Sequence, residues 1–261
     1  MGGRKFGCSN YNHGLGSHGY QTLAQGIQNS CNYYFYEVGY RLATNNYSTA
    51  YNDSLGIKKL QKYASLFGLN ERTGIEIEEA APQIANEFPV MAAIGQSNNN
   101  YTTVQLARYV TAVANEGTVY QYTLLNRLED SDGNVLQTFE PQVRNQIDVL
   151  DTEEWNAIHS GMRMVVENTK EFDGFPIEAA GKTGTAQQNL KRPNHALFVG
   201  YAPYDDPEIS IATRIAYGYT SHNAAKLARN VFAYYFNVEN EDELLNGQAA
   251  NGNSSSNEIS D

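Results

Sequence analysis

The sequence predicts an α+β fold in which an antiparallel sheet with flanking helices lies beside a helical lobe. Apolar residues recur at spacings of three and four in several long segments, which is the period of an amphipathic helix. Three β-rich runs follow one another late in the chain with short connections between them. Short connections join antiparallel strands, because a parallel pair needs a crossover of a dozen or more residues.

Five helices are expected from this spacing and from the residues at their ends. Gly68 stops the second helix, and Gly117 follows the third, where a glycine commonly ends a helix. The fourth begins with acidic residues, which interact favourably with the positive end of the helix dipole. The expected helices cover residues 20–42, 57–67, 102–115, a segment starting at 151–154, and 221–236.

The strands are expected in two groups, with one short strand apart from them at 73–77. A hairpin is predicted where residues 124–130 and 134–139 flank an Asp-Gly turn signal. The three late runs, residues 177–186, 195–201 and 208–217, form the antiparallel meander. We expect the helix at 221–236 to pack across this sheet.

The charge balance narrows the possible partners. The 261 residues carry 18 Lys and Arg against 29 Asp and Glu, a formal net charge of -11. An acidic chain is a poor ligand for phosphate backbones, so no nucleic-acid partner is predicted. No apolar run approaches the length of a membrane-spanning helix. Residues 238–261 are acidic and rich in Gly, Asn and Ser, and are expected to form a disordered tail.

The strongest local signal is the run Gly181-Lys182-Thr183-Gly184-Thr185. It matches the end of a phosphate-binding loop, but the first glycine of that loop would fall at Pro176, and a strand rather than a helix follows. An ordinary strand with one exposed lysine is a second interpretation. The third is a K-T-G strand, which resembles that of penicillin-binding proteins and serine β-lactamases.

A second signal, Ser30-Cys31-Asn32, favours the third interpretation. It lies inside an apolar stretch and is followed by aromatic residues at 33–36. Taken alone, Ser30 and Asn32 would be read as caps at a helix kink. Together with the K-T-G run, the segment 24–36 resembles the S-x-N motif of class B penicillin-binding proteins. The resemblance extends over residues 2–236, and Ser97 and Thr103 depart from the family's pattern.

The resemblance implies a fold and an activity. The fold is that of the penicillin-binding transpeptidases and serine β-lactamases. The activity is that of a D,D-transpeptidase, which cross-links peptidoglycan stem peptides by serine acyl transfer and is acylated by β-lactams. Two alternatives stay open: a D,D-carboxypeptidase or β-lactamase-like hydrolase, in which water replaces the acceptor amine, and a non-catalytic scaffold of the cell-wall machinery.

The catalytic residues implied by the resemblance are Ser30, Asn32 and Lys182. Ser30 would relay a proton with Lys182, and Asn32 would bind the substrate amide. Three neighbours on the K-T-G strand would bind the substrate. The charge of Lys182 and the hydroxyl of Thr183 suit a carboxylate, Gly184 lets a substrate backbone approach closely, and the N–H of Thr185 suits an oxyanion.

The family's acylated serine belongs to an S-x-x-K motif that precedes S-x-N. No serine in this sequence has a lysine three places later. We therefore expect residues 1–237 to be the C-terminal part of a transpeptidase domain and the isolated chain to be inactive. The expected partners are the missing N-terminal part, stem peptides, β-lactams and cell-wall synthesis proteins. The expected location is the extracytoplasmic face of a bacterial cell membrane, held by an anchor outside this chain.

No cofactor is implied, and the site prediction contains no metal ligand. Cys8, His13, His18 and Cys31 nevertheless lie within one short polar stretch. Cysteine and histidine are zinc ligands, but their spacing here does not match a C-x₂-C knuckle. The sequence leaves metal binding by these four residues open.

Overall fold

The computed structural model describes residues 7–8, 14, 16–188, 191–240 and 244. It divides into two compact units, one formed by Met1–Glu37 with Thr152–Asp261 and the other by Val38–Asp151. The sequence predicted one partial domain over residues 1–237 and did not predict this division. Most of the predicted acidic tail, residues 241–243 and 245–261, lies outside the described residues.

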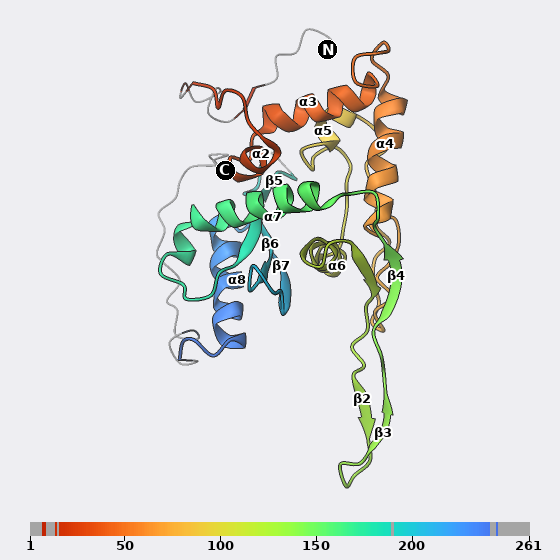
Figure 1. The fold of residues 1–261 in the computed structure, drawn as a ribbon, viewed down its shortest axis with the longest axis vertical. Coiled ribbons are helices and arrows are strands. Elements are labelled where there is room, and N and C mark those ends of the chain that lie inside the picture. Colours follow the sequence, from red (N-terminus) through yellow and green to blue (C-terminus); the bar gives the residue numbers. More distant parts are fainter. Residues whose placement is uncertain (1–6, 9–13, 15, 189–190, 241–243, 245–261) are drawn as a thin grey trace. The chain divides into compact units, whose positions relative to one another are not determined.

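The first unit is built on a three-stranded antiparallel sheet (Figure 1). Its strands lie in sequence order: β5 (Ala180–Ala186), β6 (His195–Ala202) and β7 (Ile209–Ile215). This is the meander that the sequence predicted. The register places Lys182 opposite Val199 and Gly184 opposite Leu197. The K-T-G strand is thus an outer strand of the described sheet.

The core of the first unit lies between this sheet and α8 (Ser221–Tyr235), which packs against β6 and β7 as expected. Phe198 of β6 and Phe232 of α8 are fully buried there. Phe172, from the short 3-10 helix η1 (Lys170–Phe172), stacks on Phe198 with ring centroids 5.8 Å apart. Each buried phenylalanine contributes roughly 1.5–3 kcal/mol relative to exposure. The K-T-G strand β5 also contacts α8, so this core supports one face of that strand.

Two further helices of the first unit connect the S-x-N segment to the sheet. The short helix α2 (Leu23–Gln28) packs on α7 (Thr152–Glu167), and α7 packs on β5. The backbones of α2 and α7 are close, since a Cβ at Gly161 would lie 2.9 Å from the carbonyl oxygen of Ala24. A capping box between Thr22 and Gln25 fixes the start of α2. Helix α7 thereby connects α2 to β5.

The single helix predicted over residues 20–42 is in fact two helices. α2 ends at Gln28, and α3 (Asn32–Ala43) begins after a three-residue break. Ser30 takes a left-handed backbone conformation with φ 46°, which no helix interior accepts. The N–H of Cys31 then bonds to the carbonyl of Gly26 at 3.1 Å and closes the break. The apolar period of the sequence continues through residues 29–31, so the period alone could not reveal that the helix is broken there.

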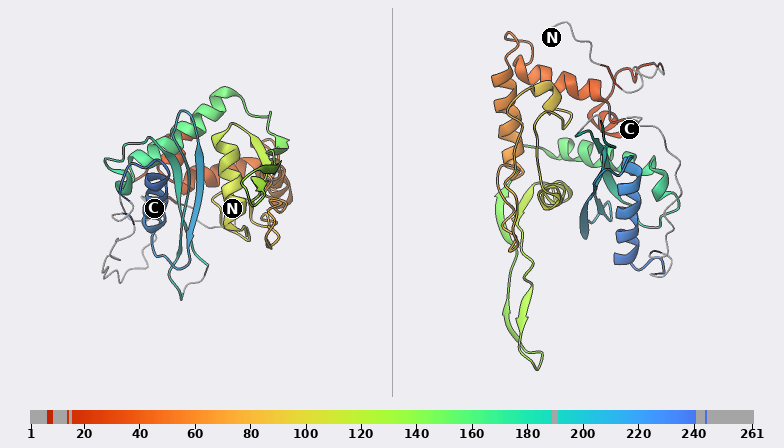
Figure 2. Two further views of the ribbon diagram at one scale, coloured as in Figure 1. Left: turned by 90° about the horizontal axis from the view of Figure 1, so that it is seen from below. Right: turned by 180° about the vertical axis from the view of Figure 1, so that it is seen from behind.

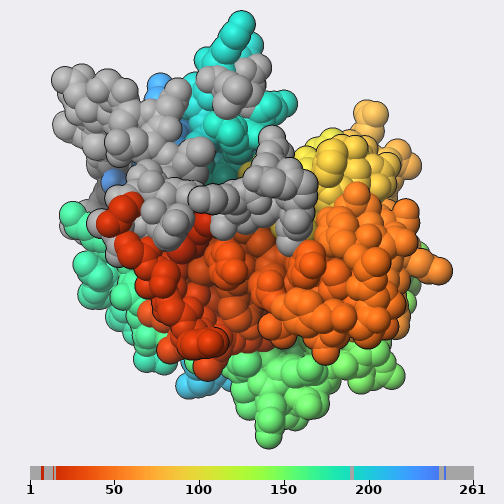
Figure 3. Space-filling view, turned by 90° about the horizontal axis from the view of Figure 1, so that it is seen from above, coloured from red at the N-terminus to blue at the C-terminus, as the bar shows by residue number. Residues whose placement is uncertain are grey.

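The second unit combines helices with two strand pairs. Its helices are α4 (Asp53–Leu66), α5 (Pro89–Ala92) and α6 (Thr103–Ala114). Its antiparallel pairs are β1 (Thr118–Gln121) with β4 (Gln142–Gln146), and β2 (Arg127–Glu129) with β3 (Val135–Thr138). The β2–β3 hairpin, predicted from its Asp-Gly turn, continues beyond β1 and β4 as a narrow arm (Figure 2). In the space-filling view, α4 and the loop before it lie at the surface in orange (Figure 3).

The strand predicted at residues 73–77 is absent from the described structure, and the prediction was wrong. A side chain binds the start of this segment where a neighbouring strand would. The carboxylate of Glu79 accepts the N–H of Thr73 at 2.7 Å and the hydroxyl of Thr73 at 3.0 Å. Gly74, at φ 88°, turns the chain out of the extended conformation.

Candidate functional site

The structure brings the two sequence motifs together through one hydrogen bond. The Nζ of Lys182 donates to the Oγ of Ser30 at 2.8 Å. Both residues belong to the first unit, Lys182 on β5 and Ser30 in the break between α2 and α3. The sequence predicted that these two side chains would act together; the hydrogen bond places them in contact, and their catalytic role stays a prediction.

The local fold explains why Ser30 points at β5. Its left-handed backbone costs about 1–3 kcal/mol for a residue other than glycine, so the surroundings must hold it. The N–H of Ser30 donates to the carbonyl of Ile27 at 3.1 Å, and the side chain of Asn29 donates to Gln21 at 2.7 Å. Strain of this kind is concentrated at functional sites. The break between α2 and α3 therefore positions the hydroxyl of Ser30 within hydrogen-bond distance of Lys182.

Lys182 is half-buried and held at two points. Besides Ser30, its Nζ donates to the carbonyl oxygen of Thr183 at 2.8 Å. Successive side chains of a strand alternate between its faces, so Lys182 and Gly184 share one face while Thr183 and Thr185 share the other. The Nζ of Lys182 therefore joins the hydroxyl of Ser30 to the backbone of its own strand.

The two glycines of the K-T-G strand have different reasons for being small. A Cβ at Gly181 would lie 2.3 Å from the ring of Phe198, so packing alone excludes any larger residue there. A Cβ at Gly184 would meet only the Cβ of Leu197, at an ordinary contact distance of 3.5 Å. Packing within the described chain does not require a glycine at 184. Its smallness is consistent with the predicted close approach of a substrate backbone.

The remaining predicted site residues lie nearby without direct links to the Ser30–Lys182 pair. Asn32 is the first residue of α3 and is half-buried. In the part of the chain that the structure describes, no hydrogen bond joins its side chain to Ser30 or Lys182. The hydroxyl of Thr185 is buried and has no hydrogen-bond partner among the described residues. The roles of Asn32, Thr183, Gly184 and Thr185 stay predictions.

A polar cluster that the sequence did not reveal closes the far end of β5. His195 pairs with Ala186 in the sheet register, and its Nδ1 accepts the N–H of Tyr217 at 3.1 Å. Its Nε2 lies 3.0 Å from the amide oxygen of Gln188 and 3.3 Å from the guanidinium of Arg214. Burial, and then the charge of Arg214, lower the pKa of His195 below its usual value of 6.5. The cluster ties the β5–β6 loop to the end of β7.

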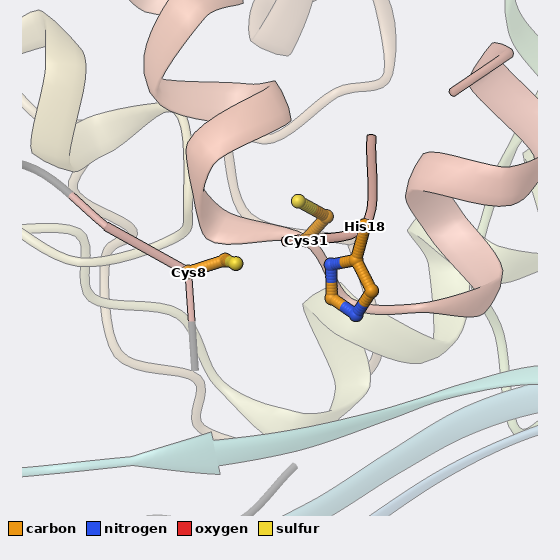
Figure 4. Close-up of side chains that lie close together, drawn as sticks. All are labelled: Cys8, His18 and Cys31. Atoms are coloured by element: carbon orange, nitrogen blue, oxygen red, sulfur yellow. The ribbon is translucent and has the colours of Figure 1, made fainter. Parts of the chain in front are cut away.

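A second cluster lies beside Ser30. Ligand atoms of Cys8, His18 and Cys31 all lie within 4.8 Å of one another. Their side chains converge from three separate segments, before α2 and at the break that follows it (Figure 4). His13, the fourth residue that the sequence suggested, lies outside the described residues. The sequence could not predict this convergence, because no fixed spacing connects the three residues.

The fold and the motif geometry agree with the comparison to known families. The family model of the penicillin-binding protein transpeptidase domain matches residues 1–233. The chain therefore belongs to the transpeptidase-domain family of penicillin-binding proteins. Its curated relatives include the peptidoglycan D,D-transpeptidase MrdA of Haemophilus influenzae, 31% identical over 84% of this chain. Penicillin-binding protein 2A of Bacillus subtilis is 26% identical over 91% of this chain.

Solved structures confirm the fold. Penicillin-binding protein 2B from Streptococcus pneumoniae superposes with a TM-score of 0.71 at 23% identity, over 83% of this chain and 39% of that one. Penicillin-binding protein A from M. tuberculosis, as an imipenem acyl-enzyme complex, gives 0.71 at 22% identity, over 86% of this chain and 50% of that one. At this identity the likeness establishes the α+β transpeptidase fold.

This chain spans a little over a third of the length of the two curated relatives, 37% of each. Of the helices that the structure describes, none combines the length and the hydropathy of a membrane span. The activity and the partners of a whole protein of this family are therefore matters for proposal.

Proposed function

We propose that this chain supplies the S-x-N and K-T-G parts of a D,D-transpeptidase site that cross-links peptidoglycan stem peptides. The observation that supports this most strongly is the hydrogen bond from Lys182 Nζ to Ser30 Oγ, 2.8 Å long. Membership in the transpeptidase-domain family supports the same reaction class. A donor–acceptor pair of this kind can carry a proton between a leaving group and the lysine.

In the proposed acylation step, a serine hydroxyl attacks the carbonyl carbon of the D-Ala-D-Ala peptide bond. An ester bond forms, the C–N bond breaks, and the serine proton passes to a nearby lysine acting as base. The departing D-Ala amine takes a proton from Ser30 Oγ, and Lys182 returns a proton to Ser30. In the second step, an amine of a neighbouring stem peptide attacks the ester, forms the cross-link and releases the serine.

The other predicted residues bind and orient the donor peptide. The N–H of Thr185 is proposed to hold the oxyanion, and Asn32 to hold the substrate amide. At the outer edge of β5, the Nζ of Lys182 from one face and the hydroxyl of Thr183 from the other are proposed to bind the terminal carboxylate. Gly184 leaves space for the substrate backbone along the outer strand, consistent with the absence of any packing need for glycine there.

The proposal places the acylated serine outside these 261 residues. No serine in the sequence is followed by lysine three places later, and that spacing is the family's nucleophile motif. The first experiment is to sequence the DNA directly upstream of the Met1 codon. An in-frame continuation with S-x-x-K supports the proposal. A start signal at Met1 with stop codons upstream would favour the scaffold alternative.

Where the continuation exists, the longer protein provides the functional test. Fluorescent penicillin should label it covalently, and a donor–acceptor pair of stem peptides should yield cross-linked dimer. Free D-Ala with no dimer would instead establish a D,D-carboxypeptidase, and rapid turnover of the penicillin would establish a β-lactamase-like hydrolase. Failure of penicillin to acylate the longer, folded protein would overturn the proposal.

The proposed setting follows from the reaction. Stem peptides lie outside the cytoplasmic membrane, so we place this chain at the extracytoplasmic face of a bacterial cell. A structure entitled "Structural coordination of polymerization and crosslinking by a peptidoglycan synthase complex" matches this fold with a TM-score of 0.68. By analogy, a glycan-polymerising protein is a proposed partner. Co-purification with such a protein from membrane extracts is the corresponding test.

A further inference from the structure

We propose that Arg214 and Arg192, beside the end of the K-T-G strand, bind a side-chain carboxylate of the donor stem peptide. That carboxylate belongs to the residue that precedes the D-Ala-D-Ala pair. The inference rests on the proposed function, which sets the direction of the donor along β5. Both arginines, and the His195 and Tyr217 side chains that they contact, belong to the first unit. The site makes the chain select among stem peptides by their charge.

The proposed function fixes the path of the donor peptide. Its terminal carboxylate lies at Lys182 and Thr183, and its scissile carbonyl oxygen lies at the N–H of Thr185. A peptide extended along β5 advances by about 3.3 Å per residue, as the strand itself does. The residue before the D-Ala-D-Ala pair therefore lies just beyond Thr185. At that point β5 ends at Ala186 and Gln188 follows.

The sheet register places the two arginine contacts on the same face as Lys182. Ala186 pairs with His195, and Leu197 pairs with Arg214 on the next strand. Directly paired residues share a face, and so do residues two apart along a strand, so Lys182, His195 and Arg214 lie on one face. A donor side chain on this face therefore points across the end of the sheet toward Arg214.

The guanidinium of Arg214 reaches back over β6 to the end of β5, and its hydrogen-bond donors are available there. The Nδ1 of His195 accepts the N–H of Tyr217, so the neutral ring carries its proton on Nε2 and donates it to the amide oxygen of Gln188 at 3.0 Å. That Nε2 cannot also accept from Arg214, 3.3 Å away. Among the described residues, the guanidinium of Arg214 thus has no hydrogen-bond acceptor.

Arg192, in the β5–β6 loop, adds a second positive charge. Its Nη1 donates to the hydroxyl of Tyr217 at 2.7 Å, and its guanidinium carbon lies 5.2 Å from the centre of that ring. The rings of Tyr217 and His195 are 4.9 Å apart. In the part of the chain that the structure describes, no carboxylate pairs with Arg192 or Arg214. Two such arginines, in a chain with 18 Lys and Arg against 29 Asp and Glu, indicate a site for an anion from outside the chain.

The chemistry of the ligand follows from the guanidinium. Its planar fork matches the two oxygens of a carboxylate, which neither an amide nor an amine reproduces. The donor's terminal carboxylate lies at Lys182 and Thr183 in the proposed function, so a second carboxylate is required. The site therefore fits an amino acid whose side chain is several carbons long and ends in a free carboxylate.

The binding test uses the purified 261-residue chain and two matched tripeptides. Both are N-acetyl-X-D-Ala-D-Ala, where X is 2-aminopimelate or its side-chain amide, so they differ only in charge. In nuclear magnetic resonance titrations, the carboxylate peptide should bind about three- to tenfold more tightly, within the range of an exposed charge pair. It should also shift the amide signals of Arg214 and Tyr217. Equal binding of the two peptides, or binding of neither by the folded chain, overturns the proposal.

Variants assign the preference to the arginines. Arg214→Gln should reduce the preference for the carboxylate peptide to less than about twofold and leave the affinity for the amide peptide unchanged. Arg214→Glu should reverse the preference, because it places a like charge beside the carboxylate. Arg127→Gln, on the exposed hairpin of the second unit, should keep the full preference. Arg192→Gln, in a loop, tests the site even if changes in β7 impair folding. Full preference in both Arg192→Gln and Arg214→Gln would exclude these ligands.

Penicillin separates this proposal from the proposed function, because it mimics the D-Ala-D-Ala pair and lacks the preceding residue. In the longer protein that carries S-x-x-K, Arg214→Gln should raise KM for the carboxylate donor and leave penicillin acylation within about twofold. Normal penicillin acylation without discrimination between the two donors would overturn the carboxylate site alone. Absence of acylation, with the carboxylate preference retained by the 261-residue chain, would overturn the transpeptidase proposal and leave the anion site standing.

Discussion

Lys182 Nζ and Ser30 Oγ are joined by a hydrogen bond of 2.8 Å across a sequence separation of 152 residues. Two independent arrangements place these atoms: a three-stranded meander holds the lysine, and a left-handed residue between two helices holds the serine. Packing of α2 on α7, and of α7 on β5, connects the two arrangements. The pair is therefore sensitive to changes in the hydroxyl and to changes in the backbone that presents it.

The hydroxyl of Ser30 is tested by replacing it in two ways. Ser30→Ala removes the hydroxyl and keeps the left-handed strain, whereas Ser30→Gly removes the hydroxyl and fits φ 46° without strain. In the longer protein that carries S-x-x-K, we expect both variants to lower the β-lactam acylation rate by about 10²- to 10⁴-fold, the usual contribution of a proton-transfer group. Stopped-flow acylation measures this, and thermal unfolding confirms the fold. Near-normal acylation by Ser30→Gly would show that conformation, not proton relay, is the residue's contribution.

Alanine substitutions at Gly184 and Gly181 distinguish a glycine needed for substrate approach from one needed for packing. Gly184→Ala meets only an ordinary contact, so the free energy of unfolding should change by less than about 0.5 kcal/mol. Its added methyl lies where the substrate backbone is proposed to run, so β-lactam acylation should fall more than about tenfold, a cost of 1.4 kcal/mol. Gly181→Ala should instead destabilise the chain by about 1–3 kcal/mol through overpacking on Phe198. Unimpaired acylation by Gly184→Ala would exclude the proposed approach of the substrate.

The part of the site predicted from sequence is the part carried by local motifs. Ser30 and Lys182 belong to short patterns that occur at known places in a known fold, so their pairing followed once both patterns were found. The break at Ser30 was missed because one left-handed residue does not interrupt the apolar period on either side. The sequence named Cys8, His18 and Cys31 among four possible metal ligands but left the question open, because their convergence depends on loop paths that no spacing encodes.

The secondary structure failed for a similar reason at residues 73–77. The alternation there is typical of a strand, but the carboxylate of Glu79 accepts the backbone N–H of Thr73, which a neighbouring strand would otherwise bind. Such side-chain competition depends on tertiary position. The meander and α8 were predicted well because their patterns are long and their connections short.

Arg108 provides a test of stability in the second unit. Its side chain is 1% exposed and donates to the carbonyl oxygens of Gly68, Glu71 and Arg72. Burial lowers its pKa, with the charges of Glu71 and Glu79 acting in the opposite direction. Arg108→Met leaves those carbonyls without their donor, and we expect the free energy of unfolding to fall by about 3 kcal/mol or more. Urea unfolding measures the change.

The matched control for Arg108 is Arg127 on the exposed hairpin. Arg127 pairs with Glu129 at the surface, and Arg127→Met should change the free energy of unfolding by less than about 0.5 kcal/mol. Arg108→Lys should not rescue stability, because a single ammonium cannot replace the forked donors of a guanidinium. A loss below about 1 kcal/mol in Arg108→Met would show that water takes over the carbonyls.

We expect protonation of His195 to make the free energy of unfolding depend on pH. Its Nδ1 accepts the N–H of Tyr217, so the neutral ring carries its proton on Nε2, toward the amide oxygen of Gln188. A second proton on Nδ1 would oppose the N–H of Tyr217 and add a positive charge 3.3 Å from Arg214. Burial and Arg214 accordingly hold the pKa of His195 below 6.5 in the folded state. The unfolded chain therefore takes up this proton at a higher pH than the folded chain does.

Because the unfolded chain binds this proton more readily, acid lowers the free energy of unfolding. The contribution of neutral His195 is fully present above about pH 6.5 and is lost as the pH falls through the lowered pKa of the folded state. His195→Gln, which cannot take up a proton, should lose less stability than the unchanged chain between about pH 7.5 and pH 5. Chemical unfolding at a series of pH values measures this difference. His222→Gln, at an exposed position near the start of α8, should retain the part of the acid-linked loss that comes from His195. Identical pH slopes for His195→Gln and the unchanged chain would show that Tyr217 and Arg214 do not oppose protonation of the ring.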